Sequence, residues 1–152
     1  MRFPRSTRLP REHYANASER FHLTLNAHPV ISTFPMAVSD AIWKAVTDER
    51  EMNRVELFAA CLMPNHLHLL LRPDAMDVIG FVNAFKSWTT RQAWSKGMRG
   101  AIWQPGMYDR TARDGADFDA IADYIVRNPV VAGFVEGEQA WPHTWAWWWE
   151  DL

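Results

Sequence analysis

Residues 63–71 read MPNHLHLLL, an apolar run that carries two histidines, His66 and His68. After Pro64, nearly every position of HLHLLLR is apolar, which is typical of a strand covered on both faces and therefore central in its sheet. Side chains alternate along a strand, so His66 and His68 project from one face while Leu67 points into the core on the other. The run predicts a central strand that presents two imidazoles from one side.

The segments around this strand predict an α+β fold. Pro64 separates the run from an apolar strand before it, and Ser39 or Asp40 is the expected cap of the first helix. The order strand, helix, strand, strand, helix, short strand, helix predicts a mostly antiparallel central sheet flanked by helices. The expected strands are 20–30, 54–64, 66–72 and a short one within 102–110, and the expected helices are 41–51, 77–96 and 116–128, the last ending before Pro129.

The domain organisation expected from 152 residues, 48% of them hydrophobic, is a single compact domain. Residues 1–19 are expected to form a loose basic arm, and residues 20–152 the domain itself, including a Trp-rich tail that we expect to pack on the core. No apolar run has the length of a membrane span, and the N-terminus resembles no secretory signal. Cys61, the one cysteine, lies in an apolar run and predicts a buried thiol in a reducing compartment, so a cytoplasmic, nucleoid-associated protein is expected.

The two histidines admit two interpretations. Imidazoles at positions i and i+2 of a strand converge on one side, where they can bind a divalent metal ion such as Zn, Mn, Fe or Cu. A site that also uses Mg needs additional oxygen ligands. The alternative is a pair of hydrogen-bonded structural histidines, and the spacing alone does not decide between them.

The last predicted helix adds a phenol and an amide. Its buried stripe follows helical periodicity, at Phe118, Ile121, Ala122, Ile125 and Val126. Tyr124 lies about 120° from the centre of that stripe, so it is not a simple core aromatic residue. Asn128 stands four residues later and projects from the same side of the helix. The alternative is a tyrosine at the rim and an asparagine that ends the helix before Pro129.

Residues 78–108 carry four positive charges and no negative one, although the whole chain has a net charge of −2. Cations can follow phosphates and indole faces can stack on unpaired bases, so this segment is a candidate surface for single-stranded DNA. An amphipathic helix with a solvated basic face is the competing interpretation. The candidate DNA-contacting residues are Lys86, Trp88, Arg91, Lys96, Arg99 and, in the loop that follows, Gln104, Tyr108 and Arg110.

Four stretches together resemble the REP-associated tyrosine transposases, relatives of the small single-domain tyrosine transposases in the HUH (His-hydrophobic-His) nuclease superfamily. They are CLMPNHLHLLL, FKSW, IWQPGMYDR and DYIVRNPVVAGFV, in that order, and the resemblance covers about residues 20–145. The resemblance implies a ferredoxin-like, RRM-like fold. It also implies a metal-dependent enzyme that nicks and rejoins single-stranded DNA at hairpin elements through a covalent 5′-phosphotyrosine.

The resemblance assigns roles to individual residues. His66, His68 and Asn128 would hold Mg²⁺ or Mn²⁺, and Tyr124 would be the nucleophile. Tyr108 and Tyr14 are the alternative tyrosines. Arg110 stands where many relatives carry a histidine, which puts any proton-transfer or phosphate-binding role at that position in question. Single-stranded or hairpin DNA is the expected partner, and the protein is expected to be a monomer or a homodimer.

Two other functional classes are compatible with the sequence. One is a catalytically silent module that binds hairpin DNA, derived from a transposase. The other is a metal-dependent hydrolase of small substrates, in which water replaces tyrosine as the nucleophile. A nicking assay with and without chelator separates the first from an active transposase, and a DNA shift at low salt argues against the second.

Overall fold

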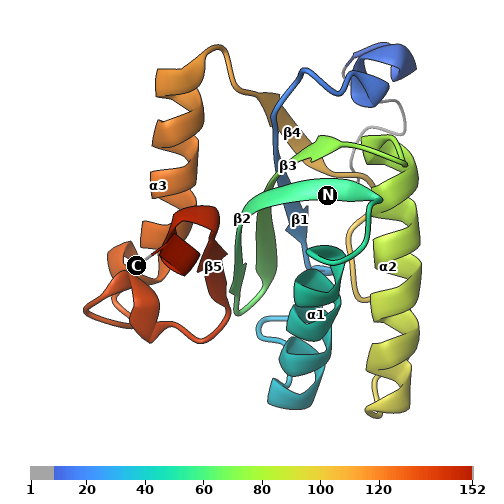
Figure 1. Cartoon of the computed structure of the whole chain (residues 1–152). Helices are drawn as coiled ribbons and strands as arrows, with labels where there is room; N and C mark the ends of the chain where they lie inside the picture. Colours follow the sequence, from blue (N-terminus) through green and yellow to red (C-terminus); the bar gives the residue numbers. More distant parts are fainter. Residues whose placement is uncertain (1–8, 152) are drawn as a thin grey trace.

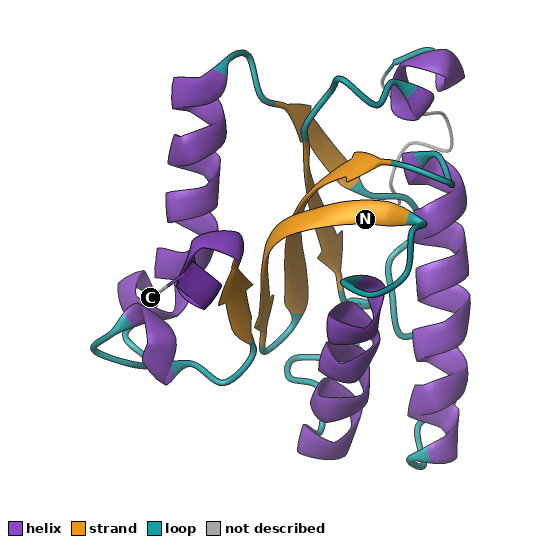
Figure 2. Ribbon diagram, viewed as in Figure 1, coloured by secondary structure: helices purple, strands orange, loops and turns teal. Residues whose placement is uncertain are grey.

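A computed structural model describes residues 9–151 of the chain, in which helices lie on both faces of a central antiparallel sheet (Figure 1). Two long helices, α1 and α2, cover one face, and α3 with the C-terminal tail covers the other (Figures 1 and 2). The elements are η1 Arg11–Ala15, β1 Phe21–Asn26, α1 Met36–Glu49, β2 Val55–Met63, β3 His66–Pro73, α2 Val78–Ser95, β4 Tyr108–Thr111, α3 Gly115–Val131, η2 Glu138–Ala140, β5 Thr144–Ala146 and η3 Trp147–Asp151.

The sheet within the described residues has the strand order β4-β1-β3-β2-β5, with every neighbouring pair antiparallel. Strands β4, β1, β3 and β2, with α1 and α2 as their crossovers, have the ferredoxin-like arrangement that the family resemblance implies. The strand β3 is central, as expected from its nearly continuous apolar character. Burial alternates along β1, with Phe21, Leu23 and Leu25 buried on the α1/α2 face.

The larger core lies between the sheet and helices α1 and α2. Leu67, Leu69 and Leu71 of β3 point into it, together with Phe81 and Phe85 of α2. The side chain of Asp77 accepts a hydrogen bond from the Gly80 N–H and so caps the start of α2. This packing fixes β3, and it leaves the even-numbered side chains of that strand on the opposite face.

A second core joins α3 and the tail to that opposite face. Its helix residues are Ile121, Ala122, Ile125 and Val126, with Phe118 at the margin, which confirms the predicted stripe. Cys61 is buried here and burial raises the pKa of its thiol to about 11, in agreement with a structural role.

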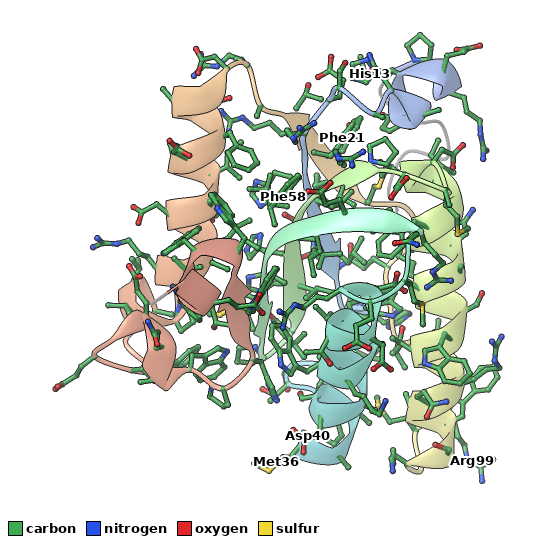
Figure 3. The ribbon with its side chains drawn as sticks, viewed as in Figure 1. His13, Phe21, Met36, Asp40, Phe58 and Arg99 are labelled. Carbon is green, nitrogen blue, oxygen red and sulfur yellow. The ribbon has the colours of Figure 1, made fainter. Side chains whose placement is uncertain are left out.

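The Trp-rich tail packs on this second core, as expected. Trp147 contacts Phe118 with a ring-centroid distance of 5.2 Å, and Phe58 lies between α3 and the sheet (Figure 3). The indole N–H of Trp141 donates to the carbonyl of Leu62. Only Thr144–Ala146 pair as a strand, at the edge beside β2.

Two predicted helix boundaries are wrong. The first helix begins at Met36 with Pro35 as its N-cap, because proline is well suited to the start of a helix and the chain already turns there. The last helix continues through Pro129 to Val131, because Pro129 is buried on the apolar face of the helix and this packing outweighs the single backbone hydrogen bond that a proline removes. The chain leaves this helix at Gly133, whose φ of 82° is readily adopted only by glycine.

The prediction of a loose arm is wrong for the described part of the N-terminal segment, while its first eight residues lie outside the described residues. Residues Arg11–Ala15 form a 3₁₀ helix, and Tyr14 is fully buried and stacks on Phe21. Its hydroxyl donates to Asp109 on β4, so this segment belongs to the fold. None of the helices within residues 9–151 combines the length and the hydropathy that a bilayer crossing requires.

Candidate functional site

Two of the three predicted metal ligands, His66 and His68, and the predicted nucleophile, Tyr124, meet on the face of the sheet covered by α3. His66 and His68 extend from β3 on this face, with ring centroids 4.9 Å apart and planes nearly perpendicular. The ring of Tyr124, from α3, lies 5.6 Å from the ring of His68. Residues separated by more than 50 positions in the sequence are therefore neighbours in the fold.

His68 is held by two side chains of the adjacent strand β1. In the antiparallel register His68 is opposite Thr24, and His22 lies two residues away on the same face. Nδ1 of His68 lies 3.0 Å from Nε2 of His22 and 3.2 Å from Oγ1 of Thr24. Nε2 of His68 is buried, and no residue that the structure describes forms a hydrogen bond with it.

His66 is held from the hairpin turn that precedes it. Its Nδ1 lies 2.9 Å from Oδ1 of Asn65. If the oxygen of the Asn65 amide faces the ring, Nδ1 of His66 is the donor and its Nε2 carries the lone pair, because a carboxamide oxygen only accepts. Both imidazoles thus use Nδ1 for a contact within the protein.

The electrostatics of the site keep these rings neutral. Burial is the main cause that lowers the pKa of His68 to about 3, and the nearby His22 and His66 lower it further. Burial, followed by the positive charge of Arg110, lowers the pKa of His22 to about 4. Burial also lowers the pKa of His66. Neutral imidazole is the form that binds a metal ion.

Helix α3 presents Tyr124 at the edge of the site. The tyrosine is 56% exposed although its ring contacts both His68 and His22, the latter at a centroid distance of 6.0 Å. Its hydroxyl can therefore be reached from outside the protein while the ring is positioned by the imidazoles. Asn128 lies one helical turn further on the same side of the helix.

The polar atoms left over at the site fit a metal ion. Besides Nε2 of His68, the side-chain nitrogen of Asn128 is buried without a partner among the described residues. The two ends of a carboxamide have nearly the same shape, and a rotated amide places its oxygen at that position. Buried polar atoms without partners are unusual, and a cation is one group that two imidazole nitrogens and an amide oxygen would satisfy.

The predicted third ligand is this amide. Within residues 9–151, no three His, Cys, Asp or Glu side chains gather into a group that could hold a metal ion. His66 and His68 supply two nitrogens, so Asn128 is the residue of α3 that would complete the set. The donor set of two imidazoles, an amide and open positions for water suits Mn²⁺ or Mg²⁺.

Strand β4 brings an arginine to the rim of the site. Arg110 is opposite His22 in the sheet, and its guanidinium donates to Oδ1 of Asp117 at 2.5 Å. The backbone N–H of Arg113 is the main cause that lowers the pKa of Asp117 to about 2, with the side chains of Arg113 and Arg110 adding to it. Tyr108, opposite Thr24, lies on the same face and is half exposed.

The predicted DNA-contacting residues of α2 are on the other side of the sheet. Helix α2 packs with α1 against the face opposite α3 (Figure 1). Trp88 is 49% exposed, and the guanidinium of Arg91 lies 5.8 Å from the centroid of its ring. Arg99 lies beyond the C-terminal end of the helix (Figure 3), and Lys96 is the C-cap of that helix. The structure thus does not bring this set together with Tyr124.

Lys86 and Gln104 hold the loop that connects α2 to β4. The ammonium group of Lys86 donates to the carbonyls of Gln104 and Gly106, and burial lowers its pKa to about 8. The amide of Gln104 donates to the carbonyl of Ala27. These contacts fix the loop that leads into β4.

The sequence analysis missed His22, Thr24 and Asn65 as site residues. A signal for the first two was present, because His22 and Thr24 occupy the polar face of the first predicted strand. What the sequence lacked was the pairing of this strand with the histidine strand, which places that polar face beside His68. Of the alternative tyrosines, Tyr14 is fully buried in the core on the opposite face.

Comparison with known proteins agrees with this geometry. The profile of the family described as "Transposase IS200 like" matches residues 17–128, which is most of the chain and includes the two histidines, the tyrosine and the asparagine. The chain belongs to the IS200-like transposase family. A REP-associated tyrosine transposase from Haemophilus influenzae is 33% identical to this family member over 101 residues, which cover 59% of the chain and 57% of that relative. The matched region is thus little more than half the length of that relative.

Two solved structures resemble this IS200-like transposase. One is a REP-associated tyrosine transposase bound to a REP hairpin, with a TM-score of 0.68 and 21% identity, covering 91% of this chain and 82% of that one. The other is a protein from Deinococcus radiodurans R1 described as a transposase, with a TM-score of 0.52 and 26% identity, covering 70% of this chain and 87% of that one. The first match shows a common fold that includes the α3 layer.

Proposed function

We propose that the protein is a metal-dependent tyrosine transposase that nicks and rejoins single-stranded DNA at hairpin elements through a 5′-phosphotyrosine. The observation that carries this proposal is the contact between the ring of Tyr124 and the ring of His68, whose buried Nε2 lacks a partner within residues 9–151. Membership of the IS200-like family supports it. The hairpin in the related structure supports hairpin DNA as the substrate.

The proposed reaction is a transesterification. The phenol oxygen of Tyr124 attacks the scissile phosphorus as the bond from phosphorus to the 3′ oxygen breaks; the phenol loses one proton and the leaving 3′ oxygen takes up one proton. The products are a phosphotyrosine on the 5′ end and a free 3′-hydroxyl, so no phosphodiester energy is lost. A 3′-hydroxyl can then attack the phosphotyrosine and join two strands. The exposure of Tyr124 supports this role, because a DNA strand needs access to its hydroxyl.

Other residues of the chain would bind the metal ion and the phosphates of the DNA. His66, His68 and Asn128 would hold a divalent ion, which when bound polarises the scissile phosphate and offsets its developing charge. The neutral state of both imidazoles, caused chiefly by their burial, suits this task at pH 7. Arg110 lies at the rim, and we propose that it contacts a phosphate of the bound strand.

The exposed surface of α2 is proposed to bind DNA outside the site. Trp88 offers an exposed indole face, and Arg91, Lys96 and Arg99 are cations without a negative residue between them in the sequence. Each lost phosphate contact is expected to reduce the slope of log K for DNA binding against log salt concentration by about 0.7. Arg91→Ala should show this change, and Lys44→Ala on α1, whose ammonium pairs with Asp48, is the matched control. An unchanged slope for Arg91→Ala would assign that residue to the solvated surface.

The test of the function is a nicking assay on single-stranded hairpin oligonucleotides taken from the flanks of the gene. We expect cleavage with Mn²⁺ or Mg²⁺, none with EDTA, and none for the variant with both His66→Ala and His68→Ala. A protein that shifts the hairpin but never cuts it would be a binding module instead. Cleavage that survives EDTA and the double variant would refute the assignment of the ligands.

A further inference from the structure

We propose that His22 is a positioning residue for the metal centre, because it accepts the Nδ1–H of His68 and directs Nε2 of that ring at the ion. This inference rests on the proposed function, since it concerns the ion that His66 and His68 would hold. It adds a residue of β1 to the site, and the residue reacts with neither the ion nor the DNA.

The tautomer follows from counting donors and acceptors. Nδ1 of His68 and Nε2 of His22 are 3.0 Å apart, so one of them carries the hydrogen. If His22 donated, Nε2 of His68 would bear a buried N–H that has no acceptor among the described residues. A buried donor or acceptor without a partner costs about 1–3 kcal/mol, so the tautomer depends on which of the two the site can satisfy. If His68 donates, its Nε2 bears a lone pair instead, and a cation can satisfy it.

Thr24 and Asn65 contact the Nδ1 atoms of His68 and His66, respectively. Oγ1 of Thr24, 3.2 Å from Nδ1 of His68, provides a second acceptor for the same hydrogen. Oδ1 of Asn65 lies against Nδ1 of His66 as an acceptor, just as Nε2 of His22 lies against Nδ1 of His68. Both rings are then fixed in the same tautomer, with Nε2 free. A partner on the second ring nitrogen typically contributes 10-fold to 100-fold to metal affinity.

His22 also borders the proposed nucleophile. Its ring centroid lies 6.0 Å from that of Tyr124 and 5.1 Å from that of His68. The same ring therefore packs against the tyrosine and supports the ligand, so the position of β1 sets the spacing between them. Glutamine at position 22 would keep an acceptor for the His68 Nδ1–H, whereas alanine would remove it.

The experiment measures Mn²⁺ affinity by calorimetry on the full chain, together with histidine tautomers by ¹⁵N NMR on the metal-free protein. His22→Ala should weaken Mn²⁺ binding 10-fold to 100-fold and give His68 a mixture of tautomers. His22→Gln should retain affinity within a few-fold of wild type and keep the Nδ1–H form. His143→Ala, in the tail and bonded to Asp40, is the control histidine and should bind as wild type does.

The outcomes separate this inference from the proposed function. Wild-type affinity in His22→Ala, or a His68 that carries its hydrogen on Nε2 in the wild-type protein, would overturn the role of His22. A wild-type protein that binds no Mn²⁺ would refute the metal centre itself. The NMR spectra of the wild type and of His22→Ala would still decide whether His22 sets the tautomer. Circular dichroism of each variant shows whether it is folded.

Discussion

The three imidazoles of the site, one buried (His68) and two half-buried (His22 and His66), predict that the protein loses stability as the pH falls below neutral. The native pKa values of His22 and His68 are about 4 and about 3, below the unfolded value of 6.5. Between these limits the unfolded chain binds more protons than the native one, so the free energy of unfolding rises with pH and levels off above about 6.5. Each histidine contributes about 1.4 kcal/mol per pH unit inside this window.

The expected loss between pH 7 and pH 5 is then about 2 kcal/mol for each of these two histidines, or about 4 kcal/mol together. His66, whose pKa is also lowered, acts in the same direction. Asp117 contributes outside this range, because its pKa is lowered from 3.8 to about 2 and its stabilisation is lost only as the pH falls below about 4. A loss of 4 kcal/mol is a large part of the stability of an ordinary domain.

The assay is urea unfolding at pH 7, 6 and 5 in the presence of EDTA, so that bound metal does not contribute. The variant His22→Gln removes one of the titrating groups and should lose about 2 kcal/mol less than the wild type over the same interval. A wild-type protein whose stability changes by less than about 1 kcal/mol between pH 7 and pH 5 would refute the reasoning. The same holds if His22→Gln and the wild type have equal slopes.

The remaining stability predictions concern the α1/α2 face, and urea unfolding at pH 7 tests them together. Glu49 is 3% exposed and accepts two bonds from Arg54, so Glu49→Ala should cost about 2–3 kcal/mol, whereas Asp48→Ala in the exposed pair with Lys44 should cost less than about 1 kcal/mol. Equal losses of unfolding free energy in Glu49→Ala and Asp48→Ala would contradict the claim that a buried ion pair contributes more than an exposed one. Phe85→Ala removes a fully buried ring from the core and should cost about 3–5 kcal/mol. A loss below 1 kcal/mol would mean that this core is not packed as described.

The sequence predicted the fold well where the pattern is local. The apolar run around His66 and His68 indicated a central strand, and β3 occupies that place. The stripe of α3 indicated correctly that Tyr124 lies off the core. These features depend only on periodicity within one element, which the order of residues contains directly.

The sequence analysis failed where a feature depends on pairing or on tertiary packing. The position of His22 beside His68 depends on the register between β1 and β3, two strands that are far apart in the sequence. The end of α3 was misplaced because Pro129 is tolerated in the last turn, where the buried face of the helix continues. The basic face of α2 was identified, but its separation from Tyr124 by the whole sheet was not.

The measurement that tests the account most directly is the search for a covalent protein–DNA adduct on a single-stranded hairpin oligonucleotide with Mn²⁺. We predict an adduct that withstands denaturing electrophoresis and maps by peptide mass spectrometry to Tyr124. Tyr124→Phe should bind the same DNA and form no adduct, and Tyr108→Phe, the other exposed tyrosine of this face, should still form it. An adduct that persists in Tyr124→Phe would contradict the account.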